Sequence, residues 1–189
     1  MFWRTLALVT GLLLTGCSNN DDTTEDDDDV HGDDDDDNVH GDDDDSASVV
    51  CVPCPGDRSI ESAADLIDVA ACANVGGGLD IMSQGEWLTS VSLECLESVE
   101  GTLQFHSNTH LTHIDLPRLE HVGITLRFQN NPQLTDITGL TSLTELTSLH
   151  IFANDVLGQI DALSSLLSVS WTLDIAFNPA LPHLPGLAP

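Results

Sequence analysis

Residues 99–111 read VEGTLQFHSNTHL, and the pattern of this stretch decides the fold because it recurs along the chain. Its Leu-x-Phe core begins at Leu103, and matching Leu-x-Ile/Phe cores begin at Leu79, Leu126, Leu149 and Leu173. Successive cores start 24, 23, 23 and 24 residues apart. Alternation of apolar positions over three residues indicates a short strand in each copy. The chain therefore reads as about five copies of one structural unit.

Other positions recur in step with these cores. Five residues after the first Leu comes an amide side chain, in Gln84, Asn108, Asn131, Asn154 and Asn178. Eight residues after it comes a large apolar side chain, in Trp87, Leu111, Leu134, Leu157 and Leu181. An apolar triad spaced i, i+3, i+6 precedes each core: Val69/Cys72/Val75, Leu93/Leu96/Val99, Leu116/Leu119/Val122, Leu140/Leu143/Leu146 and Leu163/Leu166/Val169.

One such unit cannot bury its apolar edge alone, whereas stacked copies can, and periods of 20–29 residues are typical of leucine-rich solenoids. We therefore predict an α/β solenoid. It would be a leucine-rich-repeat-like, right-handed coil of 23–24-residue units with a parallel β-sheet. Upstream, residues 59–72 read SIESAADLIDVAAC, in which Ser62 and Asp65 have the spacing of a capping box. With apolar residues at Leu66, Ile67, Val69 and Ala70, this segment predicts an N-terminal cap helix over the first unit.

The repeating segment resembles a known module. The matching pieces are residues 72–81 (CANVGGGLDI), 99–105 (VEGTLQF), 116–122 (LPRLEHV) and 177–181 (FNPAL). They resemble the receptor L domain, the leucine-rich-like module of insulin and epidermal growth factor receptor ectodomains, which has relatives in fungal cell-wall proteins and bacterial lipoproteins. The likeness covers residues 51–189, although Ile124, Thr147 and Trp171 replace the expected Gly. It implies the fold but no growth-factor binding, because the module recurs with many partners.

Four cysteines belong to this segment: Cys51, Cys54, Cys72 and Cys95. An even number in an exported domain indicates disulfides, and the prolines around Cys51-x-x-Cys54 disfavour a redox motif or half of a zinc site. The resemblance implies that one N-terminal cysteine bonds Cys72 and the other bonds Cys95. A Cys72–Cys95 bridge between adjacent units stays open as the alternative.

The residues between the inward Leu and Ile/Phe positions should point outward. They form one row of Gln104, Arg127 and His150 and a second row of His106, Gln129 and Phe152. This mixture of an aromatic ring, a cation and amides is our candidate binding face. The register sends His106, His110, His113 and His121 to different sides, so we expect surface histidines, no metal site and no cofactor.

The N-terminal third has a different composition. Residues 21–45 hold 16 of the 32 acidic residues of a 189-residue chain with a net charge of −28. That charge excludes a nucleic-acid binder. Like charges with almost no apolar residues predict that residues 17–50 form a disordered, Asp-rich tether. The tract would bind divalent cations weakly, because its match to a calcium loop is only partial.

Residues 1–16 indicate a signal peptide: Arg4 precedes an apolar run over residues 5–15 that is too short to cross a membrane. The following LTGC, residues 14–17, resembles the bacterial lipobox, which implies cleavage before Cys17 and acylation of that residue. Acyl chains on Cys17 would attach the protein to the membrane. Ser18 resembles the residue found in outer-membrane lipoproteins, so the expected location is the cell envelope, on the outer membrane where there are two.

No GxSxG, HExxH, P-loop or GxGxxG motif occurs in the sequence, and we expect no enzymatic activity. Two functions remain. The first is a membrane-anchored envelope lipoprotein whose solenoid binds or adheres to a protein, peptide or glycan. The alternative is a structural or divalent-cation-buffering envelope protein that acts through its polyaspartate tract.

Overall fold

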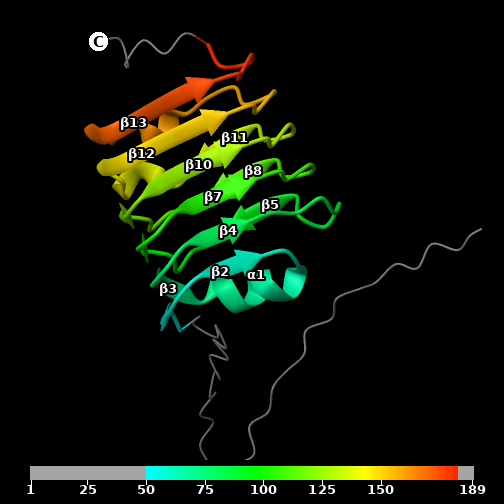
Figure 1. The fold of residues 1–189 in the computed structure, drawn as a ribbon. Coiled ribbons are helices and arrows are strands. Elements are labelled where there is room, and N and C mark those ends of the chain that lie inside the picture. Colours follow the sequence, from blue (N-terminus) through cyan, green and yellow to red (C-terminus); the bar gives the residue numbers. More distant parts are fainter. Residues whose placement is uncertain (1–49, 183–189) are drawn as a thin grey trace, which may run out of the picture. The chain divides into compact units, whose positions relative to one another are not determined.

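The computed structural model describes residues 50–182. The predicted signal peptide, the lipidation site Cys17 and the acidic tract lie outside the described residues. Within residues 50–182 the fold is mostly parallel β-sheet with few helices (Figure 1). The largest sheet has the strand order β13-β12-β10-β7-β4-β2, and its strands are β2 (Arg58–Ile60), β4 (Leu79–Ile81), β7 (Leu103–His106), β10 (Thr125–Gln129), β12 (Glu145–Phe152) and β13 (Ser168–Ala176).

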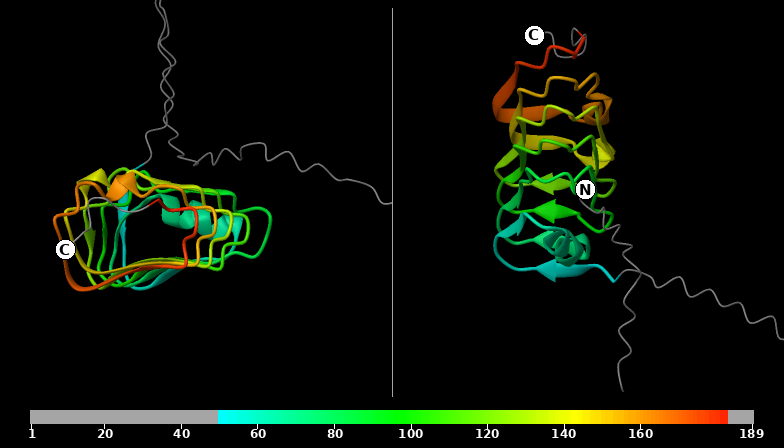
Figure 2. Two further views of the ribbon diagram at one scale, coloured as in Figure 1. Left: turned by 90° about the horizontal axis from the view of Figure 1, so that it is seen from above. Right: turned by 90° about the vertical axis from the view of Figure 1, so that its right-hand side faces the viewer.

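Two smaller parallel sheets form other sides of the molecule. One has the order β1-β3-β6-β9, with β1 (Val52–Cys54), β3 (Cys72–Val75), β6 (Ser98–Val99) and β9 (His121–Val122). The other has the order β11-β8-β5, with β5 (Ser90–Ser92), β8 (His113–Asp115) and β11 (Asp136–Thr138). The helical elements are α1 (Ala63–Ala70) and the 3₁₀ turns η1 (Leu140–Ser142) and η2 (Asp161–Leu163). Viewed from above, successive passages of the chain overlie one another around a common interior (Figure 2).

The strand register joins positions that the sequence alignment placed together. Leu79 pairs with Leu103, Leu103 with Leu126, and Leu149 with both Leu126 and Leu173. Leu and Ile/Phe alternate with outward residues, so their side chains meet in one continuous apolar core. In the centre of that core the rings of Phe105 and Phe128 stack with centroids 5.4 Å apart.

A column of asparagines satisfies the turns that follow the large sheet. Asn131 Nδ2 donates to the carbonyl of Phe105 and to Asn154 Oδ1, and Asn131 Oδ1 accepts from Asn108 Nδ2. Asn154 Nδ2 donates in turn to Asn178 Oδ1. Asn108, Asn131 and Asn154 are fully buried, so these hydrogen bonds pair backbone groups that water does not reach.

The first unit departs from the predicted register. The backbone N–H of Ser83 donates to Asn108 Oδ1 where Gln84 was expected, and Gln84 is exposed. Leu88 is buried where Trp87 was expected, and Trp87 is exposed. Ser83 and Leu88 are five residues apart, whereas Asn108 and Leu111 are three apart. A longer turn therefore displaces both positions.

The cap helix is present, with narrower bounds than predicted. Ser62 is its N-cap: Asp65 N–H donates to Ser62 Oγ at 3.3 Å, and Ser62 N–H donates to Asp65 Oδ2 at 2.8 Å. The prediction was wrong at both ends of the segment, because Ser59 and Ile60 lie in β2 and Cys72 begins β3. Of the apolar residues in this segment, Val69 is buried and Ile67 is exposed.

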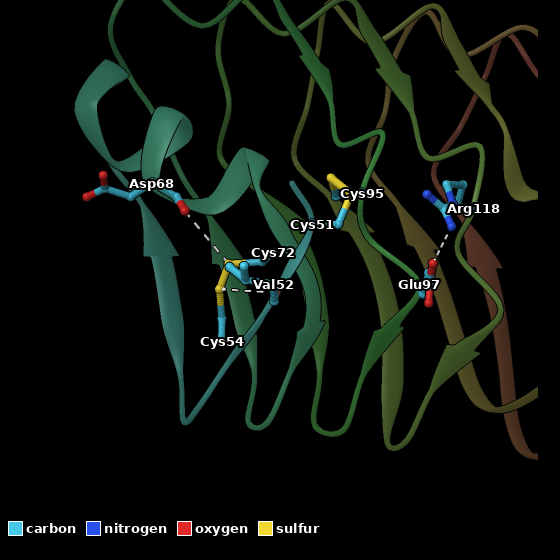
Figure 3. Close-up of a disulfide and its surroundings, with 8 residues drawn as sticks. All are labelled: Cys51, Val52, Cys54, Asp68, Cys72, Cys95, Glu97 and Arg118. Atoms are coloured by element: carbon cyan, nitrogen blue, oxygen red, sulfur yellow. Dashed lines mark hydrogen bonds and ion pairs between the residues drawn. A yellow bond between two sulfur atoms is a disulfide. The ribbon is translucent and has the colours of Figure 1, made fainter. Parts of the chain in front are cut away.

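Two disulfides connect the first strands (Figure 3). Cys54 bonds Cys72 with Cα atoms 5.5 Å apart, and Cys51 bonds Cys95 with Cα atoms 5.4 Å apart. The structure therefore has the pairing that the resemblance implied, and the alternative Cys72–Cys95 bridge is wrong. Strand β1 runs beside β3, and this places Cys54 close enough to bond Cys72.

Candidate binding face

Strands β7, β10 and β12 bring the six predicted residues together on one face of the large sheet. Arg127 pairs in register with Gln104 on one side and His150 on the other. One step along the strands, Gln129 pairs with His106 and Phe152. All six side chains are half-buried, while the residues between them are buried in the core. We call the face made by these six residues the sheet face.

Two histidine–aspartate contacts flank the sheet face. His106 Nε2 lies 2.9 Å from Asp80 Oδ1, and His150 Nδ1 lies 3.7 Å from Asp174 Oδ2. The buried Asp80 Oδ1 lacks a partner in hydrogen-bond geometry, so the short contact with His106 is electrostatic and depends on the charge of the imidazole. Each of the two acids beside the sheet face thus has a histidine as its neighbour.

Arg127 is a cation without an anion at the centre of this arrangement. Within residues 50–182 no ion pair or hydrogen bond holds its side chain, and its Nε atom is buried without a partner. Arg118 differs, because it forms an ion pair with Glu97 (Figure 3). The guanidinium presents a planar fork of donors that fits a carboxylate, phosphate or sulfate. Arg127 is therefore available for an anionic group from outside the domain.

An aromatic pair lies at the end of the sheet face nearest β13. The rings of Phe152 and Phe177 have centroids 4.9 Å apart and a tilt of 59°. The sequence placed Phe152 on the exposed face, yet Phe152 is half-buried and Phe177 is the exposed ring, at 72%. A shallow hollow of about 480 Å³ adjoins it, lined by Asp155, Phe177, Asn178 and Pro179.

The backbone of Phe177 is strained. Phe177 has φ of 58°, in the left-handed region that disfavours bulky residues. The equivalent positions directly before the asparagine column share this conformation and carry smaller side chains: Ser107, Asn130 and Ala153. The conformation therefore belongs to the turn before each asparagine, and Phe177 is the one position of the four where it carries a large apolar side chain. Sequence reasoning missed Phe177, although its place before Asn178 was a signal that could have found it.

The other histidines of this region, which we expected on the surface, lie apart. His113 in β8 is 3.8 Å from Asp136, His121 is exposed in β9, and His110 contacts the hydroxyl of Thr109. The described part of the chain has no group of three or more His, Cys, Asp or Glu side chains placed to hold a metal ion. Among the same residues, no helix has both the length and the apolar character needed to span a membrane.

Comparisons with known proteins add no assignment. No model of a known protein family matches the sequence, and no curated protein matches it.

Proposed function

We propose that this chain is a non-enzymatic, membrane-anchored lipoprotein of the bacterial cell envelope that binds a protein, peptide or glycan through its sheet face. The proposal includes the finer architecture, a right-handed, leucine-rich-repeat-like solenoid over residues 51–189. The 23–24-residue period of the sequence supports it, as does the register that pairs equivalent leucines on neighbouring strands. Residues 1–16 would be the signal peptide and residues 17–50 the lipidated tether.

The unpartnered Arg127 carries the proposal for the site. Among the described arginines, Arg118 has an ion pair with Glu97 and neither Arg58 nor Arg127 has one, but only Arg127 lies on the sheet face. The two nearest acids of the sheet, Asp80 and Asp174, each contact a histidine. An incoming carboxylate, sulfate or phosphate would satisfy the donors of Arg127. We therefore expect the ligand to present an anionic group at this position.

The aromatic pair supports the same face. Phe177 offers an exposed apolar ring beside the polar rows, and rings and arginines are enriched where binding energy concentrates in interfaces. The amides of Gln104 and Gln129 can donate to and accept from a polar ligand. The face thus combines an apolar anchor, a charged anchor and adaptable hydrogen-bonding groups.

An array of acidic peptides, neutral peptides and carboxylated or sulfated glycans tests the proposal on purified protein. We expect selective binding to anionic members. Arg127→Ala and Phe152→Ala should each weaken binding by about 1 kcal/mol or more, roughly fivefold in Kd. Arg118→Ala is the matched control, because it removes the same charge away from the sheet face and should bind normally.

A deletion variant distinguishes this proposal from the alternative function, in which the acidic tract acts by binding divalent cations. Deletion of residues 21–45 should abolish divalent-cation binding and leave ligand binding intact. If both sheet-face variants bind a discovered ligand as tightly as the wild type, the site assignment fails.

A further inference from the structure

Strand β13 is the last strand of the large sheet and has an open edge. The sheet order runs from β13 to β2, so one side of β13 pairs with β12 and the other has no strand partner among residues 50–182. Its nine residues extend for about 30 Å. Such a row of backbone donors and acceptors is a template for pairing with another strand.

Large apolar side chains gather along this edge. Leu167 is 82% exposed and Trp171 is 84% exposed. Leu173 is 46% exposed, whereas Leu149, its partner in β12, is 1% exposed. This difference in exposed fraction shows how much of the leucine a further neighbouring strand would cover. Beneath the edge, further apolar residues are only partly buried: Leu163, Leu166, Val169, Ile175 and Leu181.

The opposite end of the sheet is closed. Helix α1 packs on β2, and Ile60 in β2 is fully buried although β2 is also an edge strand. Figure 1 shows the helix at the β2 end, while β13 lies at the other end without such a cover. Of the two edge strands of the large sheet, β13 therefore has exposed large apolar side chains and β2 has none.

Charge also distinguishes the β13 end. Residues 167–182 contain one ionisable side chain, Asp174, in a chain with a net charge of −28. Repulsion between two copies of so acidic a chain opposes their approach, and it is weakest where charges are fewest. Of the surfaces in residues 50–182, the β13 end is where a second copy meets an apolar and nearly uncharged edge.

Residues 183–189 have a sequence that is a poor partner strand for β13. They read HLPGLAP, and Pro185 and Pro189 lack the N–H that a ladder requires. A second β13 has the required length, the apolar side chains and the free backbone groups.

We infer that two copies of this chain associate through β13, paired antiparallel about a twofold axis. A twofold contact presents the same patch on both copies and closes the assembly at two. The exposed surface of Leu167, Trp171 and Leu173 amounts to roughly 400 Å² per copy. This is about half of the ~800 Å² that each partner buries in a stable interface, and the backbone of the paired strands adds to it.

The test measures the mass of the detergent-solubilised, exported chain by sedimentation velocity at micromolar concentration. We expect a dimer for the wild type. Trp171→Asp and Leu167→Asp should each give half that mass, because a charge would be buried at the contact. Ile124→Asp is the matched control: Ile124 is exposed and apolar, but it precedes β10, and this variant should stay dimeric.

All three variants share one N-terminus, so acyl chains cannot account for a difference between them. Far-ultraviolet circular dichroism checks that each is folded, and having two variants guards against the failure of one. A monomeric, folded wild type overturns the inference, as does a dimer that both aspartate variants keep. If deletion of residues 183–189 is needed to obtain a dimer, that segment covers β13 and the inference is equally wrong.

Discussion

Asp65 shows how one side chain begins the cap helix. The hydrogen bond from Ser62 is the largest cause that lowers the pKa of Asp65 below its ordinary value of 3.8, and the backbone N–H of Glu61 adds to it. A carboxyl whose pKa is lower in the folded state stabilises the fold while it is ionised. This contribution is present above pH 3.8 and is lost as the pH falls through the lowered pKa.

We therefore expect Asp65→Asn to lower the free energy of unfolding at pH 7, and the difference from wild type to vanish in acid. Urea denaturation at both pH values measures it. Asp68→Asn is the matched control on the same helix, because Asp68 is exposed and takes no part in the cap. An Asp65→Asn deficit that persists unchanged in acid would show that the cap does not act through the ionised carboxylate.

At the level of residues, the sequence predicts what depends on local spacing. The capping box of Ser62 and Asp65 follows from their separation in the chain and is confirmed. The exposure of Phe177 does not follow, because it depends on which neighbour covers its ring. The lack of an anionic partner for Arg127 does not follow from the sequence either. It depends on Asp80 and Asp174 contacting His106 and His150 and not Arg127.

The asparagine column holds the strand-to-turn segments together. Asn131 is fully buried. Its Nδ2 donates to the carbonyl of Phe105, and its Oδ1 accepts from the backbone N–H of Asn108. Asn131→Ala would leave these backbone groups buried without partners, at about 1–3 kcal/mol each. We expect a loss of roughly 3–5 kcal/mol in the free energy of unfolding, measured by urea denaturation.

Asn178→Ala provides the comparison within the same column. Asn178 is only partly buried, so water can replace its bonds to Ile151 and Ala176. The expected loss is about 1 kcal/mol. Equal losses for the two variants would mean that burial does not set the importance of the column.

At the level of elements, the strand positions follow from the alternation of Leu and Ile/Phe. The displaced turn of the first unit does not, because spacing alone cannot tell which residue of a longer turn enters the core. Within this turn, a Cβ at Gly85 would lie 2.6 Å from the ring of Trp87, so the position has no room for a side chain. Strand β2 was missed because three residues are too few to show an alternation of apolar and polar positions. Its pairing with β4 also depends on a partner 21 residues away.

At the scale of the whole molecule, the N-terminal predictions concern residues outside those described. Cys17→Ser removes the only sulfur that the lipobox offers for acylation. We expect this variant to lose metabolic labelling with palmitate and to be released from the membrane fraction or to stay uncleaved. Palmitate incorporation equal to that of the wild type would refute lipidation at Cys17.

The central claim is that a ligand lies on the sheet face, and photo-crosslinking from single positions tests it most directly. A photoreactive residue at Gln129 is surrounded by His106 and Phe152, whereas one at Glu120 precedes β9 on another sheet. In intact cells, we predict adducts of higher mass from position 129 and none from position 120. Adducts from position 120 with none from position 129 would contradict the claim.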